Sequence, residues 1–94
     1  ISENRPPLYN MLGYNYIGAN KMEEAEKAFN KYIELLPNEP NPYDSKGDYY
    51  MAVKEYKLAE ESYEKAYNID PVSFRISQEK AKTAKKLQKT ANDK

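Results

Sequence analysis

Residues 9–16 read YNMLGYNY and residues 43–50 read YDSKGDYY, so that two tyrosines and a glycine recur together 34 positions later. The same shift superposes three further pairs, which are Ala25 and Ala59, Phe29 and Tyr63, and Pro37 and Pro71. The repeated residues alternate between large and small at three- and four-residue steps, as two interlocking helices require. The period therefore predicts two copies of one helix pair.

Turn-forming residues separate the expected helices. Residues 18–20 form the first tight turn, in which Asn20 can adopt the left-handed conformation that ends a helix. A proline disfavours helical geometry in the residue before it, so residues 36–40 end the first pair and residues 70–71 end the second. The sequence thus predicts four helices before residue 72.

Two polar residues are expected to cap the helices that follow these prolines. Asn41 precedes Pro42 and is expected to cap the first helix of the second pair. Ser73 is expected to cap a final helix at about residues 74–90. An apolar stripe on that helix comprises Ala81, Ala84, Leu87 and Ala91. We therefore predict an all-α fold of about five helices.

The chain resembles the tetratricopeptide repeat family. The resemblance is carried by the 34-residue period, the Tyr-x-x-Leu-Gly-x-x-Tyr opening at residues 9–16, the paired alanine and aromatic of the second helix and the proline that closes each unit. It implies a right-handed α-solenoid of helix-turn-helix repeats. We expect a single domain over residues 1–94, with repeat one at 6–39, repeat two at 40–73 and a capping helix at 74–91. Because Ile1 is not an initiator methionine, we also expect the chain to be part of a larger protein.

The second unit departs from the pattern at Lys46, which stands where the first unit has Leu12. A lysine can bury its aliphatic stem while its ammonium group stays solvated or paired. We therefore expect the Lys46 stem to pack between the repeats and its ammonium to reach water or an acid.

The composition argues against several kinds of active site. Cysteine and histidine are both absent, which excludes thiol nucleophiles, disulfides and thiolate or imidazole metal sites. Asp44 and Asp48 lie four residues apart and share a helix face, but a metal ion would need several more oxygen ligands. The apolar runs fall far short of the ~20 residues that span a bilayer. We expect no catalytic residue, no cofactor, no metal and no membrane span, and hence not an enzyme.

The zero net charge conceals an uneven distribution. Residues 1–71 carry 8 Lys and Arg against 13 Asp and Glu, whereas residues 72–94 carry 7 against 2. A basic tail could touch nucleic acid or an anionic membrane. Its apolar stripe is mostly alanine, however, and lacks interleaved aromatic residues. We interpret the tail as the polar outer face of a terminal helix, which repeat arrays need for solubility, and expect no nucleic acid partner.

The family resemblance also implies a binding surface, because the first helix of each pair lines a concave groove in which partners bind as extended or helical peptides. Carried over by spacing, that face comprises Asn10, Tyr14, Ile17, Asp44, Asp48, Met51, Arg75 and Lys82. We expect Tyr14 and Met51 to anchor a partner and the two aspartates to select its basic residues. The alternative is that the apolar members only pack across neighbouring first helices.

The resemblance thus implies a protein-protein interaction module, or scaffold, that binds a peptide or a partner helix. Two alternatives stay open. Two repeats are fewer than the three or so that a solenoid normally needs, so the end near Leu8, Met11 and Leu12 could stack on another copy and form a homo-oligomer. The module could also be a regulatory appendage of a larger enzyme. The sequence does not indicate the compartment.

Overall fold

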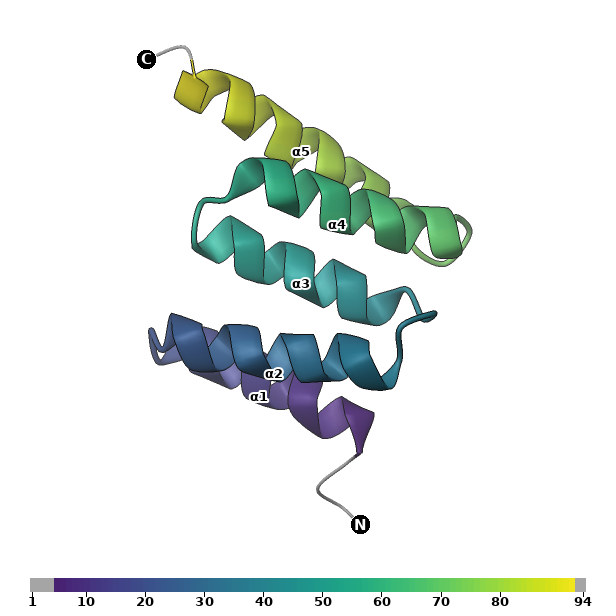
Figure 1. The fold of residues 1–94 in the computed structure, drawn as a ribbon. Coiled ribbons are helices and arrows are strands. Elements are labelled where there is room, and N and C mark those ends of the chain that lie inside the picture. Colours follow the sequence, from purple (N-terminus) through teal and green to yellow (C-terminus); the bar gives the residue numbers. More distant parts are fainter. Residues whose placement is uncertain (1–4, 93–94) are drawn as a thin grey trace.

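The computed structural model describes residues 5–92, which form five helices stacked in chain order (Figure 1). Their bounds are α1 Pro6–Gly18, α2 Met22–Leu35, α3 Asn41–Ala52, α4 Tyr56–Ile69 and α5 Arg75–Asn92. The described part of the chain contains no strand. The predicted all-α fold of helix pairs is confirmed. None of the helices within residues 5–92 is long and apolar enough to cross a membrane.

Each helix pair closes around a glycine and an aromatic ring. Gly13 of α1 faces the ring of Phe29 on α2, and Gly47 of α3 faces the ring of Tyr63 on α4. A Cβ atom added to Gly47 would lie 2.5 Å from a carbon of the Tyr63 ring, and one added to Gly13 would clash with Phe29 in the same way. The helices approach this closely only because glycine has no side chain. This contact explains why the glycine and the aromatic residue recur together.

The turns inside the two pairs also repeat. Asn20 follows α1 with a φ of 59°, which confirms the left-handed turn expected there. Lys54 follows α3, 34 residues later, with a φ of 64°. Few residues other than glycine, asparagine and aspartate favour this region, so the lysine indicates that the turn geometry is imposed by the packing of α3 on α4.

The two predicted caps are wrong. Pro40 precedes α3, and Asn41 lies inside the helix, where its Nδ2 donates to the Tyr32 hydroxyl of α2 at 2.8 Å. The Asn41 amide therefore joins the two repeats instead of satisfying the helix end. Helix α5 begins at Arg75, two residues after Ser73, and the Ser73 backbone N–H donates to the Asp70 side chain at 3.1 Å.

Helix α5 packs along α4 through small residues. Ala81 and Ala84 are buried in one cluster with Ala59 and Tyr63. Of the expected apolar stripe, only Ala81 and Ala84 in the first part of the helix reach the core, whereas Leu87 and Ala91 are exposed. The last helix therefore covers the open side of the second repeat with its first three turns.

Lys46 is buried between α2 and α3, with 6% of its surface exposed. Its ammonium group contacts the side-chain oxygen of Asn30 and lies 3.7 Å from Glu26 Oε2. It also faces the rings of Tyr49 and Tyr50, 5.7 and 5.0 Å from their centroids. Burial lowers the pKa of Lys46, and Glu26 opposes that shift. The prediction that the stem packs while the ammonium reaches an acid is confirmed.

Replacing Lys46 with leucine is expected to leave the free energy of unfolding unchanged or to raise it by about 1 kcal/mol, since an apolar side chain of similar volume removes the cost of burying a charge. Lys46→Ala should instead lower it by about 2 kcal/mol, because it leaves a void. Urea unfolding of both variants tests this pair of results. If Lys46→Leu is as destabilising as Lys46→Ala, the contacts of the ammonium group stabilise the fold.

Candidate functional site

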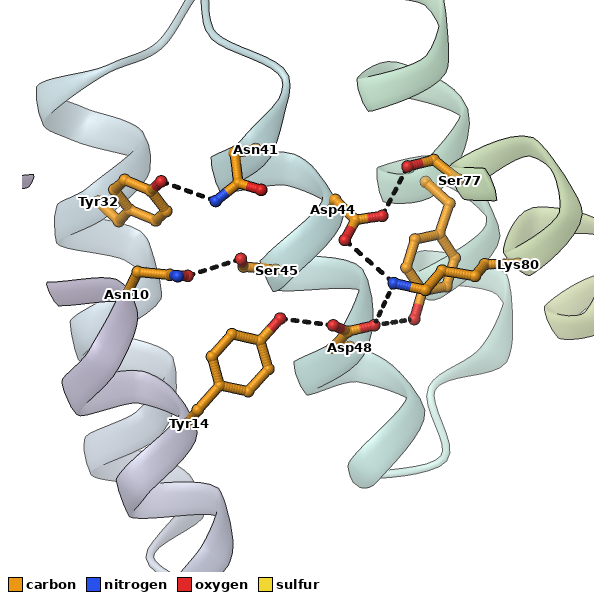
Figure 2. A network of polar contacts seen from close by, with 10 residues as sticks. Asn10, Tyr14, Tyr32, Asn41, Asp44, Ser45, Asp48, Ser77 and Lys80 are labelled. Carbon is orange, nitrogen blue, oxygen red and sulfur yellow. Dashed lines mark hydrogen bonds and ion pairs between the residues drawn. The ribbon is translucent and has the colours of Figure 1, made fainter. Parts of the chain in front are cut away.

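Side chains from α1 and α3 meet on one face of the stack (Figure 2). The Tyr14 hydroxyl donates to Asp48 at 2.5 Å, and the Ser45 hydroxyl donates to Asn10 at 2.7 Å. Tyr14 also packs edge-on against Phe29, with ring centroids 5.1 Å apart. The first helices of the two pairs are therefore joined at two levels.

Lys80 of α5 bridges the two aspartates of α3 (Figure 2). Its Nζ lies 3.0 Å from Asp44 Oδ2 and 3.2 Å from Asp48 Oδ1. The Ser77 hydroxyl donates to Asp44 at 2.6 Å, and the Tyr63 hydroxyl donates to Asp48 at 2.5 Å. Both aspartates are thus already paired within the protein, and one polar network connects α1, α3, α4 and α5.

A hollow of about 410 Å³ lies between α3 and α5, next to this network. It is lined by Asp48, Met51, Tyr63, Glu79, Lys80 and Thr83. The network and the hollow share Asp48, Tyr63 and Lys80. The polar line across the helices therefore borders a concave surface.

The family model described as tetratricopeptide repeat matches residues 6–39 and 41–73. The chain is a tetratricopeptide repeat protein. The first match contains α1 and α2, the second contains α3 and α4, and α5 fits a capping helix. Tetratricopeptide repeats are generally protein-protein interaction modules and typically non-catalytic scaffolds. No curated protein sequence matches the chain.

Three donors of the network in this tetratricopeptide repeat protein, Tyr14, Tyr63 and Lys80, have raised pKa values. Burial raises the pKa of the Tyr14 and Tyr63 hydroxyls above the ordinary 10.0, and the hydrogen bonds to Asp48 raise it further. Burial disfavours the charge on Lys80, but the hydrogen bonds and charges of Asp44 and Asp48 outweigh this effect and raise its pKa above the ordinary 10.5. The network is therefore intact at physiological pH.

Raising the pH is expected to destabilise the repeats only in the alkaline range. Because these three groups have higher pKa values in the folded state than in the unfolded chain, the folded state holds more protons above about pH 10, and the free energy of unfolding falls there. Below about pH 10 their contribution is fully present. The pKa values of Tyr49 and Tyr50 are also raised and act in the same direction, whereas the pKa of Lys46 is lowered.

With no histidine in the chain, stability should be nearly constant between about pH 6 and 9. Urea unfolding across pH 6 to 12 measures this dependence. Tyr14→Phe should make the alkaline loss shallower, because it removes one of the titrating hydroxyls. A decline in stability that already begins near pH 7 would contradict the assignment.

The other residues predicted on the groove divide into two groups. Ile17 is half-buried against the core cluster that contains Ala25 and Phe29, and Met51 is half-buried against the cluster around Tyr63. Both side chains therefore contribute to packing between helices. Met51 also lines the hollow beside Asp48, so that it belongs to the core and to the surface at once.

Arg75 and Lys82 lie apart from the network. Arg75 is exposed in the first turn of α5, and Lys82 is exposed at 3.7 Å from Glu79. Lys82 lines a separate hollow of about 480 Å³ between α4 and α5, together with Glu64 and Tyr67. The 34-residue period aligns Lys82 with Asp48, but in the structure it is Lys80 that reaches Asp48.

Lys80, Ser77, Tyr63 and Thr83 were missing from the predicted site. The period marks Tyr63 as a core residue, and its hydroxyl gives no separate signal in the sequence. The 34-residue period also aligns Lys46 with Lys80. Because Lys46 faces the preceding helix pair, this alignment could have indicated that Lys80 does so too. Their partners differ, because Lys46 meets α2 and Lys80 meets α3.

Proposed function

We propose that this tetratricopeptide repeat protein binds an extended peptide or a partner helix along the face made by α1, α3 and α5. The observation that carries the proposal is the line of side chains that joins these helices on one side, from Asn10 and Tyr14 through Asp48 to Lys80 (Figure 2). The aromatic ring of Tyr14 supplies apolar contact surface on this face, because the residue is 38% exposed.

The charge of this face favours a basic partner. Asp44 and Asp48 together carry two negative charges, and Lys80 supplies one positive charge between them. The carboxylates are 15% and 28% exposed, so that the remaining negative charge is accessible from the surface. Complementary charge speeds association and excludes wrong partners. A lysine or arginine of the partner is therefore expected near Asp48.

The test begins with capture of a partner on the immobilised chain and compares two groove variants with a control. Tyr14→Ala should weaken binding by roughly tenfold, chiefly through faster dissociation, because it removes an aromatic contact. Asp48→Asn should weaken it by a similar factor at low salt and by less at high salt, because it removes charge. Glu61→Gln removes a charge from the exposed part of α4 and should bind as the parent does.

Circular dichroism must first show that each variant is folded, since Tyr14 also packs on Phe29 and bonds to Asp48. Surface plasmon resonance then gives both rate constants. If folded Tyr14→Ala and Asp48→Asn bind the partner as the parent does, the binding site lies elsewhere on the protein.

Self-association is a second candidate, supported by the exposed end of the stack. A hollow of about 250 Å³ between α1 and α2 is lined by Tyr9, Leu12, Tyr16, Glu24, Lys27 and Ala28. The residue of repeat two that corresponds to Leu12 is Lys46, which α2 covers. A second copy could cover the same surface of repeat one. Light scattering over a range of concentrations distinguishes the two candidates by the mass of the purified protein.

A further inference from the structure

The hollow between α3 and α5 is chemically apolar although polar residues line it. Asp48 accepts from Tyr14, Tyr63 and Lys80, so that its oxygens are already engaged. The Thr83 hydroxyl donates to the Glu79 backbone carbonyl of its own helix at 3.2 Å. Among the described residues, no buried side-chain polar atom lacks a partner. The buried polar atoms around the hollow are therefore satisfied within the protein.

The walls of the hollow are held in place. Tyr63 is 2% exposed and is held by its bond to Asp48, and Lys80 lies over the Tyr63 ring at 5.1 Å from its centroid. Met51 forms the apolar wall on α3 and Thr83 lies opposite on α5. A volume of about 410 Å³ is close to the lower end of ligand sites, about 300–1,000 Å³. It can receive a large side chain from a partner that lies along this face.

The rim of the hollow carries an excess of one negative charge. Glu79 stands at its edge with its side chain 67% exposed, but its carboxylate is paired with Lys82 at 3.7 Å. Asp44 and Asp48 supply the excess, because Lys80 balances only one of their two charges. An apolar side chain that enters the hollow is therefore best accompanied by positive charge on the neighbouring residues of the same peptide.

We propose that this hollow binds one large apolar side chain of a peptide whose adjacent residues are basic. The proposal rests on the proposed function and gives it a specificity: the hollow selects the anchor residue, and the excess negative charge of the rim selects its neighbours. Burial of a leucine-sized side chain contributes enough to distinguish it from glycine by tenfold or more.

The three methionines of the chain provide the measurement. Met51 lines the hollow, whereas Met11 is exposed on α1 and Met22 packs near the start of α2. The methyl resonance of each is followed by nuclear magnetic resonance during titration with an acetylated, amidated pentapeptide in which one leucine stands between two lysines. Two matched peptides carry glycine in place of the leucine, or glutamates in place of the lysines.

We expect the Met51 methyl resonance to shift in a saturable manner while those of Met11 and Met22 stay unchanged. The glycine peptide and the glutamate peptide should each bind at least tenfold more weakly. An unmoved Met51 resonance, or a glycine peptide that binds as tightly as the leucine peptide, would overturn the proposal.

A matched pair of variants tests the hollow without altering the core. Thr83→Phe should fill the hollow from α5 and weaken binding of the leucine peptide at least tenfold. Thr90→Phe makes the same change two turns later on α5, at a threonine that likewise donates to the backbone carbonyl four residues earlier. It should bind as the parent does. Equal binding by both folded variants would contradict the assignment.

The outcomes also separate this proposal from the function on which it rests. If Tyr14→Ala and Asp48→Asn weaken binding of the captured partner and Thr83→Phe does not, the groove binds the partner and the hollow is not its specificity site. If the peptide fills the hollow but the captured partner binds Tyr14→Ala and Asp48→Asn with parental affinity, the proposed groove function is wrong. A partner that requires both surfaces supports both proposals.

Discussion

Gly47→Leu is expected to lower the free energy of unfolding by about 3 kcal/mol, the upper end of the usual range for overpacking. A Cβ atom at this position would lie 2.5, 2.6 and 2.9 Å from three carbons of the Tyr63 ring. That ring is held by its bond to Asp48 and by α5, so it has little freedom to move aside. Thermal and urea unfolding followed by circular dichroism measure the loss.

Gly18→Ala is the matched control for this prediction. Gly18 ends α1, nothing lies within 4 Å of a Cβ atom built there, and no described glycine has a positive φ. The alanine should therefore raise the free energy of unfolding by up to about 1 kcal/mol, because it restricts the unfolded chain. If Gly47→Leu has the same free energy of unfolding as the parent, α3 and α4 do not approach each other as closely as the structure shows.

Deletion of residues 74–94 is expected to abolish cooperative unfolding. The loss of α5 uncovers Ala59 and Tyr63 and removes Lys80 from the two aspartates of α3. Small domains have free energies of unfolding of only about 5–15 kcal/mol. The free energy lost by exposing one side of the second repeat is comparable with this whole value. We expect aggregation or a broad, non-cooperative melt, measured by light scattering and calorimetry.

A charge variant separates the structural role of α5 from its basic character. Lys85→Gln together with Lys86→Gln alters two exposed lysines and should leave the melting of the full chain unchanged. If the truncated chain stays monomeric and equally stable, the tail is a free basic arm, and binding to nucleic acid becomes the better hypothesis.

The helix pairs could be predicted because their closest contacts use residues that are visible in the sequence. The contact of Gly47 with Tyr63 repeats that of Gly13 with Phe29, so a single physical constraint appears twice at the same spacing. Asn20 was predictable for a similar reason, since few residues favour its backbone conformation. The environment of Lys46 could be predicted because a lysine at an apolar position must bury its stem and still keep its ammonium group solvated or paired.

The lysine of α5 that meets α3 was missed. The expected stripe included Ala81 and Ala84, which are buried, but it did not indicate which of the neighbouring lysines reaches Asp48. A rotation of the helix by one or two residues decides whether Lys80 or Lys82 meets Asp48. That rotation depends on how α5 fits against Tyr63 and Ala59 on α4, which is a property of the packed structure. Asn41 was misassigned for a related reason, because its partner Tyr32 belongs to the other repeat.

The most direct test of the account maps the bound partner on the protein. Backbone amide resonances of the labelled chain are compared with and without a saturating amount of the captured partner, and the shifted amides are placed on the structure. We predict that the largest shifts fall on α1, α3 and α5 around Tyr14, Asp48 and Lys80. Shifts confined to α2 and α4, or to the exposed end near Leu12, would contradict the assignment of this face as the binding surface.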